Sequence, residues 1–156
     1  MIRNVHQRVL PCSQEQAAYL IDSLAGPHEA VWPSDRWPRL KLDGGLTPGS
    51  QGGHGPIRYF VEEYQPGYSV QFRFTRPSGF HGTHALELKA HQHGCLLEHN
   101  LSMTTTFWGW FQWHLVYGPL HDALLEDALD RAAGHFGQPP RNRHSPWVRL
   151  LRFLLG

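Results

Sequence analysis

The sequence predicts an α+β fold in which a curved antiparallel sheet wraps around a long C-terminal helix. Four β-rich runs of alternating polar and apolar residues follow one another between residues 57 and 106. A long amphipathic helical pattern comes next, over residues 110–136. A first strand and a short capped helix precede them. A sheet that grips a helix leaves a pocket between the two, so a function is to be sought there.

The N-terminal segment predicts one strand and one helix. Residues 3–10 alternate polar and apolar side chains, as a half-buried strand does. Ser13 and Gln16 have the spacing of a capping box, in which each side chain satisfies a free backbone N–H of the other residue. We therefore expect a short helix over residues 14–24, ended by Gly26.

Residues 26–56 are rich in Gly and Pro and predict a long loop, with a short strand at residues 39–43. Loops of this length in a compact domain are usually mobile or functional. Trp32 and Trp37 are costly to expose to water, which indicates that the segment folds over an apolar surface. Two interpretations remain open: a lid over the pocket, or a loop packed on the core.

The four β-rich runs predict an antiparallel meander. They cover residues 57–65, 68–76, 84–91 and 95–106. Pro66-Gly67 suits a type II turn, because Pro presets the first central angle and Gly tolerates the positive φ of the second. His93-Gly94 is expected to form a similar turn between the last two runs, residues 84–91 and 95–106. Links this short join neighbouring antiparallel strands.

Strand parity assigns the side chains to the two faces of the sheet. The inward sets are Val70, Phe72 and Phe74; Leu86, Leu88 and Ala90; and Leu97, Leu101 and Met103. His84 begins an inward set, and His99 lies within the last one. Two histidines are therefore expected to point toward the core.

The final helix has an apolar face made of Leu120, Leu124, Leu125, Ala128, Ala132 and Phe136. His121 falls within this face, and the same count carried backward adds Trp110, Trp113, His114 and Tyr117. Asp122, Glu126, Asp127 and Asp130 fall on the other side of the helix or at its border. Pro119 removes a backbone hydrogen bond and predicts a kink.

Size and composition exclude several classes of protein. The chain has 156 residues, which fits one domain, and a formal net charge of +1 at pH 7, which gives no basic field for nucleic acid. Cys12 and Cys95 have no disulfide-framework or zinc-ligand spacing, so a reducing compartment fits best. No secretory signal or bilayer-spanning run is present. We expect a cytoplasmic protein that binds no nucleic acid.

The last residues predict a distinct tail, 138–156, after a domain that covers residues 1–137. No acidic residue follows Asp130, whereas arginines accumulate. Residues 146–155 can form a short helix on which Trp147, Leu150, Leu151 and Leu154 lie together. We expect this face to pack on its own domain or on a second copy of the chain, as in a homodimer. The alternative is weak contact with an anionic membrane surface.

Three stretches resemble bacterial members of the START-like (SRPBCC) superfamily, the polyketide cyclase/dehydrase and lipid-transport proteins. They are residues 63–74 (EYQPGYSVQFRF), 82–88 (GTHALEL) and 119–127 (PLHDALLED), and the resemblance covers residues 5–137. It implies a helix-grip fold with a deep apolar pocket between sheet and helix. The superfamily includes aromatase/cyclases, hydrolases, lipid carriers and ligand sensors, so the resemblance does not choose an activity.

Eleven residues are the predicted ligand-binding set. The apolar lining is expected from Tyr64, Phe72, Phe74, Leu86, Leu97, Trp110, Trp113 and Tyr117. His84, His99 and His121 would orient the ligand through hydrogen bonds, unless each is a core histidine bonded to its neighbours. No catalytic residue and no cofactor are assigned.

Neither a metal site nor a nucleophile is predicted. His114 and His121 lie about 10 Å apart along a helix, too far to bind one ion. His91 and His93 share a strand face but lack further ligands at a diagnostic spacing. Ser102 lies opposite His99 in strand parity, so a Ser-His-acid arrangement has no support.

The favoured function is binding or transport of a hydrophobic small molecule, such as a lipid, a polyketide-like or a quinone-like compound. An enzymatic alternative is a cyclase or dehydrase that uses a cavity histidine as general acid/base. A further alternative is an oligomerising or membrane-peripheral adaptor that acts through the tail.

Overall fold

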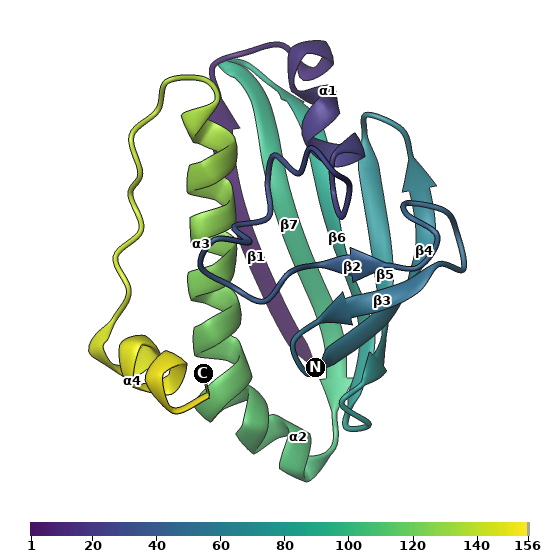
Figure 1. Cartoon of the computed structure of the whole chain (residues 1–156), viewed down its shortest axis with the longest axis vertical. Coiled ribbons are helices and arrows are strands. Elements are labelled where there is room, and N and C mark those ends of the chain that lie inside the picture. The colour runs from purple at the N-terminus through teal and green to yellow at the C-terminus, as the bar shows by residue number, and fades with distance from the viewer. Residues whose placement is uncertain (156) are drawn as a thin grey trace.

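The computed structural model describes residues 1–155 and has the predicted α+β architecture (Figure 1). The strands are β1 (Ile2–Leu10), β2 (Lys41–Leu42), β3 (Gln51–His54), β4 (Ile57–Gln65), β5 (Ser69–Arg76), β6 (Phe80–His91) and β7 (Gly94–Thr105). The helices are α1 (Gln14–Asp22), α2 (Phe107–Gln112), a π-helical turn η1 (Trp113–Tyr117), α3 (Gly118–Gly134) and α4 (Pro146–Leu155).

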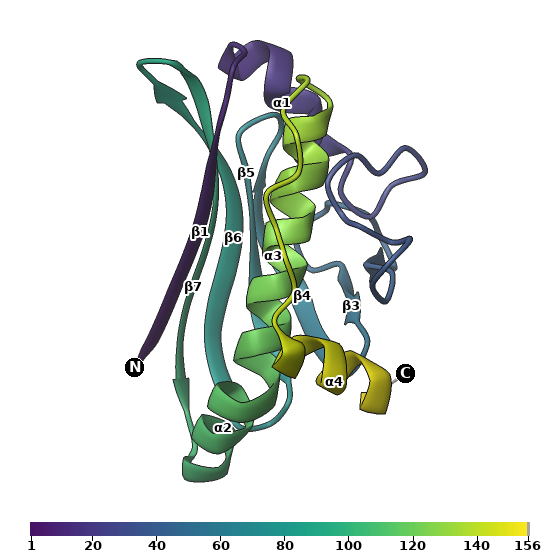
Figure 2. The same cartoon turned by 90° about the vertical axis from the view of Figure 1, so that its left-hand side faces the viewer.

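The strands form one antiparallel sheet of seven, in the order β1-β7-β6-β5-β4-β3-β2. The first strand pairs with the last, so the meander from β2 to β7 is completed at its far edge by β1. Figure 2 shows the sheet curving around α3, with α1 across one end and α2 and α4 at the other. The helix-grip architecture predicted from the sequence is therefore confirmed.

Local signals in the sequence placed most elements to within a few residues. Ser13 and Gln16 form the predicted capping box at the start of α1. Gly67 follows Pro66 with a φ of +74°, as the expected turn requires. The short strand β3 was missed, because its two central glycines weaken any strand pattern.

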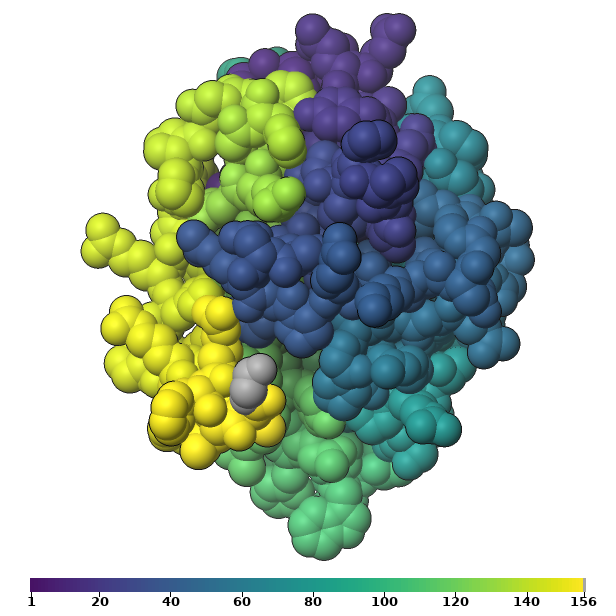
Figure 3. Space-filling view, in the orientation of Figure 1, coloured from purple at the N-terminus to yellow at the C-terminus, as the bar shows by residue number. Residues whose placement is uncertain are grey.

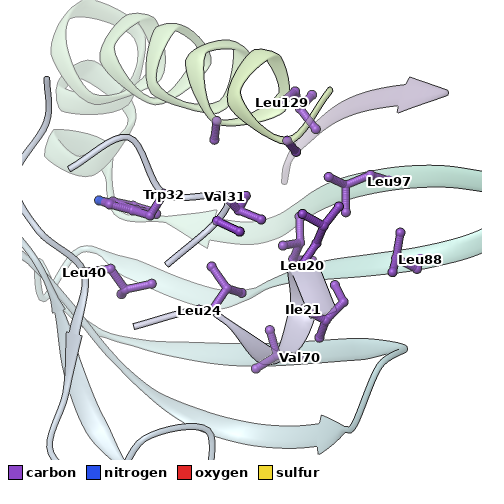
Figure 4. Packing of buried hydrophobic residues seen from close by; sticks show 14 of the residues in the cluster. Leu20, Ile21, Leu24, Val31, Trp32, Leu40, Val70, Leu88, Leu97 and Leu129 are labelled. Atoms are coloured by element: carbon purple, nitrogen blue, oxygen red, sulfur yellow. The ribbon is translucent and has the colours of Figure 1, made fainter. Parts of the chain in front are cut away.

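The core lies between α1, α3 and the sheet, as Figure 4 shows for ten labelled side chains. A second, smaller cluster under η1 consists of Phe80, Leu101, Met103 and Trp113. Of the inward sets predicted by parity, Phe74 is half-buried, Ala90 is exposed and the others are buried. Ala90 was assigned wrongly to the core, because the end of the β6–β7 hairpin bends away from the helices (Figure 2).

The kink predicted at Pro119 is a π-helical turn that ends just before this residue. Pro119 has no N–H to donate to the carbonyl of Leu115, and Gly118 instead donates to Trp113, five residues back. The freed Leu115 carbonyl accepts a 2.9 Å hydrogen bond from the indole of Trp147. The distortion in the long helix therefore provides an attachment point for α4.

A row of polar contacts fastens α3 to β1. Asn4 donates to Asp122 (2.9 Å), His6 lies 2.7 Å from Glu126, and Arg8 donates to Asp130 at 2.6 Å. Two residues of a strand advance about 6.7 Å and four residues of a helix about 6 Å, so the two series stay in step. Below, these six residues are called the polar row.

Two of the four carboxylates that the sequence placed on the other side of α3 or at its border are buried, whereas Asp122 and Glu126 are partly exposed. Asp130 is buried against Arg8. Asp127 is also buried and accepts hydrogen bonds from Trp37, Asn142 and His144. The helical wheel could not show this, because these partners belong to other segments of the chain.

Candidate functional site

A cavity of about 780 Å³ lies between the sheet, the α3 side of the long helix and the loop that carries both tryptophans. Its volume is typical of sites for drug-sized molecules. Most of its lining is apolar: Leu24, Val31, Trp32, Leu40, Ile57, Phe72, Phe74, Phe80, Leu86, Leu101, Trp113, Val116, Leu120, Leu124, Leu125, Ala128 and Leu129. The polar lining includes His54, Tyr59, His84, His99, Tyr117, His121, Arg36, Arg149 and Arg152.

Eight of the eleven residues predicted as ligand-binding line this cavity: Phe72, Phe74, His84, Leu86, His99, Trp113, Tyr117 and His121. The other three lie outside the lining. The Tyr64 hydroxyl donates to Asp22 at 2.7 Å, and Leu97 is fully buried in the core. Trp110 is 48% exposed and packs on His114, because α2 turns away from the direction of α3.

Three of the cavity histidines form a continuous row. His84 Nδ1 lies 3.2 Å from His99 Nε2, and the rings of His99 and His121 are 5.2 Å apart between centroids. The His84 ring also stacks on Phe72 and Phe74, at interplanar angles of 24° and 26°. Strands β6 and β7 and helix α3 thus bring together three residues that the sequence could only assign separately to inward faces.

These imidazoles are neutral at pH 7. Burial lowers the pKa values of His84 and His99 well below their usual range, and neighbouring histidines lower them further. Burial also lowers the pKa of His121, although the nearby Asp122 carboxylate opposes the shift. His54 has its pKa lowered to about 3, mainly by burial. A neutral imidazole carries one donor and one acceptor nitrogen, so each can bond to a hydroxyl or a carbonyl group.

Three nitrogens of this row have no hydrogen-bond partner within the part of the chain that the structure describes. His84 Nε2, His99 Nδ1 and His121 Nδ1 are all buried and unpaired. Leaving such groups unpaired costs about 1 to 3 kcal/mol each. A polar group brought into the cavity, together with a small rotation of the rings, would offset this cost.

The loop before β2 covers one side of the cavity and is firmly held. Trp32 and Trp37 both line the cavity, and their indoles donate to the Pro38 carbonyl and to Asp127. Glu29 accepts the backbone N–H groups of Ala25, Val31 and Trp32. The apolar surface under the two tryptophans that the sequence indicated is therefore the cavity.

Helix α4 completes the cavity wall, which the sequence did not indicate. Arg152 donates to the carbonyl of Arg36, and its guanidinium lies 4.6 Å from the centroid of the Trp37 ring. Val148 and Leu151 are its buried apolar residues. The helix thus packs on its own domain through Val148 and Leu151, whereas Trp147, Leu150 and Leu154 of the predicted face are exposed.

Helices α4 and α2 lie at the same end of the molecule (Figure 3), and both contribute to an exposed apolar surface. Below it is called the apolar patch, and it consists of Phe107, Trp108, Trp110, Phe111, Leu115, Trp147, Leu150, Phe153, Leu154 and Leu155, which are 39 to 83% exposed. The sequence has no Asp or Glu in residues 99–121 or 131–156. The segments that form the patch therefore carry arginines and no carboxylate.

One group of potential metal ligands occurs among the described residues. It joins His6 of β1 to His121 and Asp122 of α3, with the three ligand atoms within 4.8 Å of one another. Spacing along the sequence could not point to it, because His6 lies 115 positions before His121. His114 is exposed and stacks on Trp110 instead.

The two cysteines are neighbours in space, with their Sγ atoms 3.7 Å apart, and both are free thiols. Burial and the hydrogen bond with Cys12 raise the pKa of Cys95 to about 12. The thiol of Cys95 is thus protonated, as expected for a buried apolar residue rather than a nucleophile.

Comparisons with known proteins identify the fold. No protein-family model matches the chain, and a search of curated proteins finds no match. Among solved structures, XoxI from Bacillus cereus aligns with a TM-score of 0.64 at 16% identity, over 88% of this chain and 97% of its own. CalU16 from Micromonospora echinospora aligns with a TM-score of 0.59 at 16% identity, over 98% of this chain and 83% of its own.

DynU16, encoded in the dynemicin biosynthetic locus, aligns with a TM-score of 0.57 at 15% identity, over 90% of this chain and 49% of its own. Identities this low establish a common fold and nothing more specific. Fold and cavity together define a helix-grip domain. No helix among residues 1–155 has the length and apolar character needed to cross a membrane.

Proposed function

We propose that this protein binds a hydrophobic small molecule that carries at least one hydroxyl or carbonyl group, in the cavity between the sheet and α3. The cavity itself carries the proposal: about 780 Å³ of space with an apolar lining would be costly to maintain without an occupant. The unpaired nitrogens of His84 and His99 favour a ligand with a polar group over a pure hydrocarbon. Lipid-like, polyketide-like and quinone-like compounds meet both conditions.

We also propose membership of the START-like superfamily. The sequence resemblance over residues 5–137 and the helix-grip fold both support it, and DynU16 shows that a similar fold occurs in a biosynthetic locus. Superfamily membership would be consistent with ligand binding and with catalysis alike.

The first experiment is native mass spectrometry of the purified protein, followed by identification of any compound carried with it. Thermal unfolding of the delipidated protein with a library of lipids, polycyclic phenols and quinones then tests binding directly. A ligand at 100 times its Kd stabilises the folded state by about 2.7 kcal/mol. Absence of both a retained compound and any thermal shift across the library would refute the proposal.

A cavity-filling variant makes the test specific. Ala128 lies on α3 in the cavity lining, so Ala128→Phe should remove ligand binding. Gly134→Phe, at the end of the same helix, enters open space and is the matched control, which should bind like the wild type. Equal binding by both variants would place the ligand elsewhere.

A second candidate function is acid/base catalysis of a cyclisation or dehydration. The observation that favours it is the contact between the neutral imidazoles of His84 and His99 on the cavity wall, because one can accept a proton while the other stabilises the resulting charge. Any compound identified in the cavity can be incubated with His84→Phe, His99→Leu and His121→Gln variants. Turnover that survives all three replacements would exclude a histidine mechanism, and binding without turnover in the wild type would favour a carrier.

The apolar patch leads us to propose a transient contact with an anionic membrane surface, from which a lipophilic ligand would enter. Trp and Phe side chains together with arginines, in segments that contain no Asp or Glu, are typical of interfacial helices. Arg149, Arg152 and Phe153 belong to α4 and also line the cavity, so the patch adjoins the cavity.

Cosedimentation with phosphatidylcholine vesicles, with and without phosphatidylglycerol, tests this contact. We expect binding to the anionic vesicles that weakens in high salt and is lost in Trp108→Ala/Phe153→Ala. Tyr68→Ala, at an exposed aromatic position outside the apolar patch, is the control. A stable homodimer by light scattering that dissociates in the Trp108→Ala/Phe153→Ala variant would instead assign the patch to a second copy of the chain.

A further inference from the structure

The junction of β1 and α3 has the geometry of a metal site. His6 Nε2 lies 3.1 Å from Asp122 Oδ1, and His121 Nδ1 lies 3.5 Å from the same oxygen. Ligands at about 2.0 to 2.1 Å from a tetrahedral zinc ion are separated from one another by roughly 3.3 to 3.4 Å. The three ligand atoms all fall within 4.8 Å of one another. A small movement of the side chains would therefore let all three contact one ion.

The surroundings of the three ligands match those of known metal sites. His6 Nδ1 lies 2.7 Å from Glu126 Oε1, so the carboxylate holds the ring with Nε2 toward Asp122. A carboxylate on the far nitrogen of a ligating histidine is the usual outer partner in zinc proteins, where it fixes the tautomer and raises the basicity. Asn4 orients Asp122 in turn, through a 2.9 Å hydrogen bond.

His121 Nδ1 is the least satisfied atom of the group. It is buried and makes no hydrogen bond of good geometry, since its nearest acceptor is the Asp122 oxygen at 3.5 Å. Entry from solvent is open, because the Asp122 side chain is 49% exposed while the two imidazoles are 14 and 16% exposed. An ion could therefore reach the site and pair the free nitrogen.

We propose that His6, His121 and Asp122 bind a divalent transition metal ion, with zinc(II) as the best fit. Two imidazoles and one carboxylate suit zinc better than calcium or magnesium, which prefer oxygen ligands alone. Three protein ligands leave a coordination position free, as in sites where the metal contacts a substrate or water. Because His121 also lines the cavity, the ion would lie next to the proposed ligand site. The proposal does not depend on the identity of the cavity ligand.

Without an ion, the same contacts serve as an ion pair between His6 and two carboxylates, so an experiment must separate the two roles. Protein dialysed against EDTA is titrated with ZnCl₂ by calorimetry, and with CoCl₂ by visible absorption, which reports tetrahedral coordination directly. We expect one equivalent of zinc per chain, with a Kd of about 1 μM or tighter.

Three test variants and two controls distinguish this site from adventitious binding. His121→Gln and Asp122→Asn should each weaken binding at least about a hundredfold, and Glu126→Gln, which changes only the outer partner, about 10- to 100-fold. His114→Gln, at an exposed position of the same helical region, and the double variant His91→Gln/His93→Gln are the controls and should bind zinc like the wild type.

Circular dichroism of each variant checks that it is folded, and His121→Gln alone suffices if a replacement in the polar row unfolds the chain. Zinc affinity weaker than about 100 μM in the wild type would overturn the proposal. So would retention of wild-type affinity by His121→Gln, or loss of binding in the His91→Gln/His93→Gln control.

Discussion

Replacing Asp130 with asparagine should destabilise this protein by about 3 kcal/mol, because it leaves a buried arginine without its main partner. The Arg8 and Asp130 side chains are 5 and 8% exposed. Asp130 accepts hydrogen bonds from Arg8 Nη1 (2.6 Å) and from the backbone N–H groups of Arg141 (2.8 Å) and Asn142 (2.7 Å). The amide keeps the shape of the side chain but removes its charge.

The size of this destabilisation depends on the contacts that Arg8 keeps in the Asp130→Asn variant. Removing one partner of a buried ion pair costs roughly 3 to 5 kcal/mol. Glu126 still faces Arg8 at 3.1 Å in the variant, so the lower end of this range applies. For a chain of this size, 3 kcal/mol corresponds to a fall in Tm of about 6 to 12 °C.

Chemical denaturation and calorimetry measure the change, with two further variants as references. Glu62→Gln removes the same charge from the exposed pair with Arg73 and should cost less than about 1 kcal/mol. Adding Arg8→Met to Asp130→Asn should recover about 1 to 2 kcal/mol, because the unpaired buried cation is gone. If Asp130→Asn costs no more than Glu62→Gln, the reasoning about burial is refuted.

The pH dependence supplies an independent check. Burial raises the pKa of Asp130, but the hydrogen bonds from Asn142, Arg8 and Arg141 outweigh it and hold the pKa below its ordinary value of 3.8. A lowered folded-state pKa gives stability that is complete above the unfolded-state pKa and is lost as the pH falls through the folded one. The stability difference between wild type and Asp130→Asn should thus be constant from pH 7 to about pH 5 and shrink below about pH 4.

Three further changes test other parts of the structure. Ser13→Ala removes the capping box of α1 and should lower the free energy of unfolding, measured by chemical denaturation, by about 1 kcal/mol. An unchanged free energy of unfolding would show that the capping box does not stabilise the protein. Gly82→Ala puts a methyl group against the backbone of Ser102 and Met103 and should lower the free energy of unfolding by about 2 to 3 kcal/mol. Its control is Gly134→Ala, whose methyl group enters open space at a helix end. This control should leave the free energy of unfolding unchanged or raise it by up to about 1 kcal/mol. Arg152→Ala removes both contacts of α4 with the tryptophan loop and should speed hydrogen exchange at the amides of residues 34–37, an effect that the exposed Arg143→Ala should not reproduce.

Sequence reasoning identified eight residues of the cavity lining because strand parity and helical periodicity depend only on local spacing. Phe72, His84 and His99 each lie on an inward face, as their positions in alternating runs require. Trp110 was misplaced because a single helical period was extended across η1, where the π-helical turn changes the direction of the chain. A helical period therefore holds within α2 and within α3, but it cannot be carried from one helix to the other across η1.

The contacts that close the site could not be read from the sequence. His6 meets His121, Arg8 meets Asp130, and Trp37 meets Asp127, and each pair is at least 90 positions apart. The chain carries no local mark of such pairs, since a carboxylate at a helix border looks the same whether it faces water or an arginine. In the folded protein, Asp122, Glu126 and Asp130 of α3 contact β1 and form one half of the polar row.

By itself the sequence determined the order of the elements, the turns at Gly67 and Gly94, the cap of α1 and the inward faces of the strands. These depend on interactions among residues close together along the chain. Tertiary structure alone decided that the three cavity histidines form one row, that α4 completes the cavity wall and that β1 and α3 bring metal ligands together. The physical reason is that burial, pKa shifts and ligand geometry arise where distant segments pack, and the relative position of those segments is a property of the whole fold.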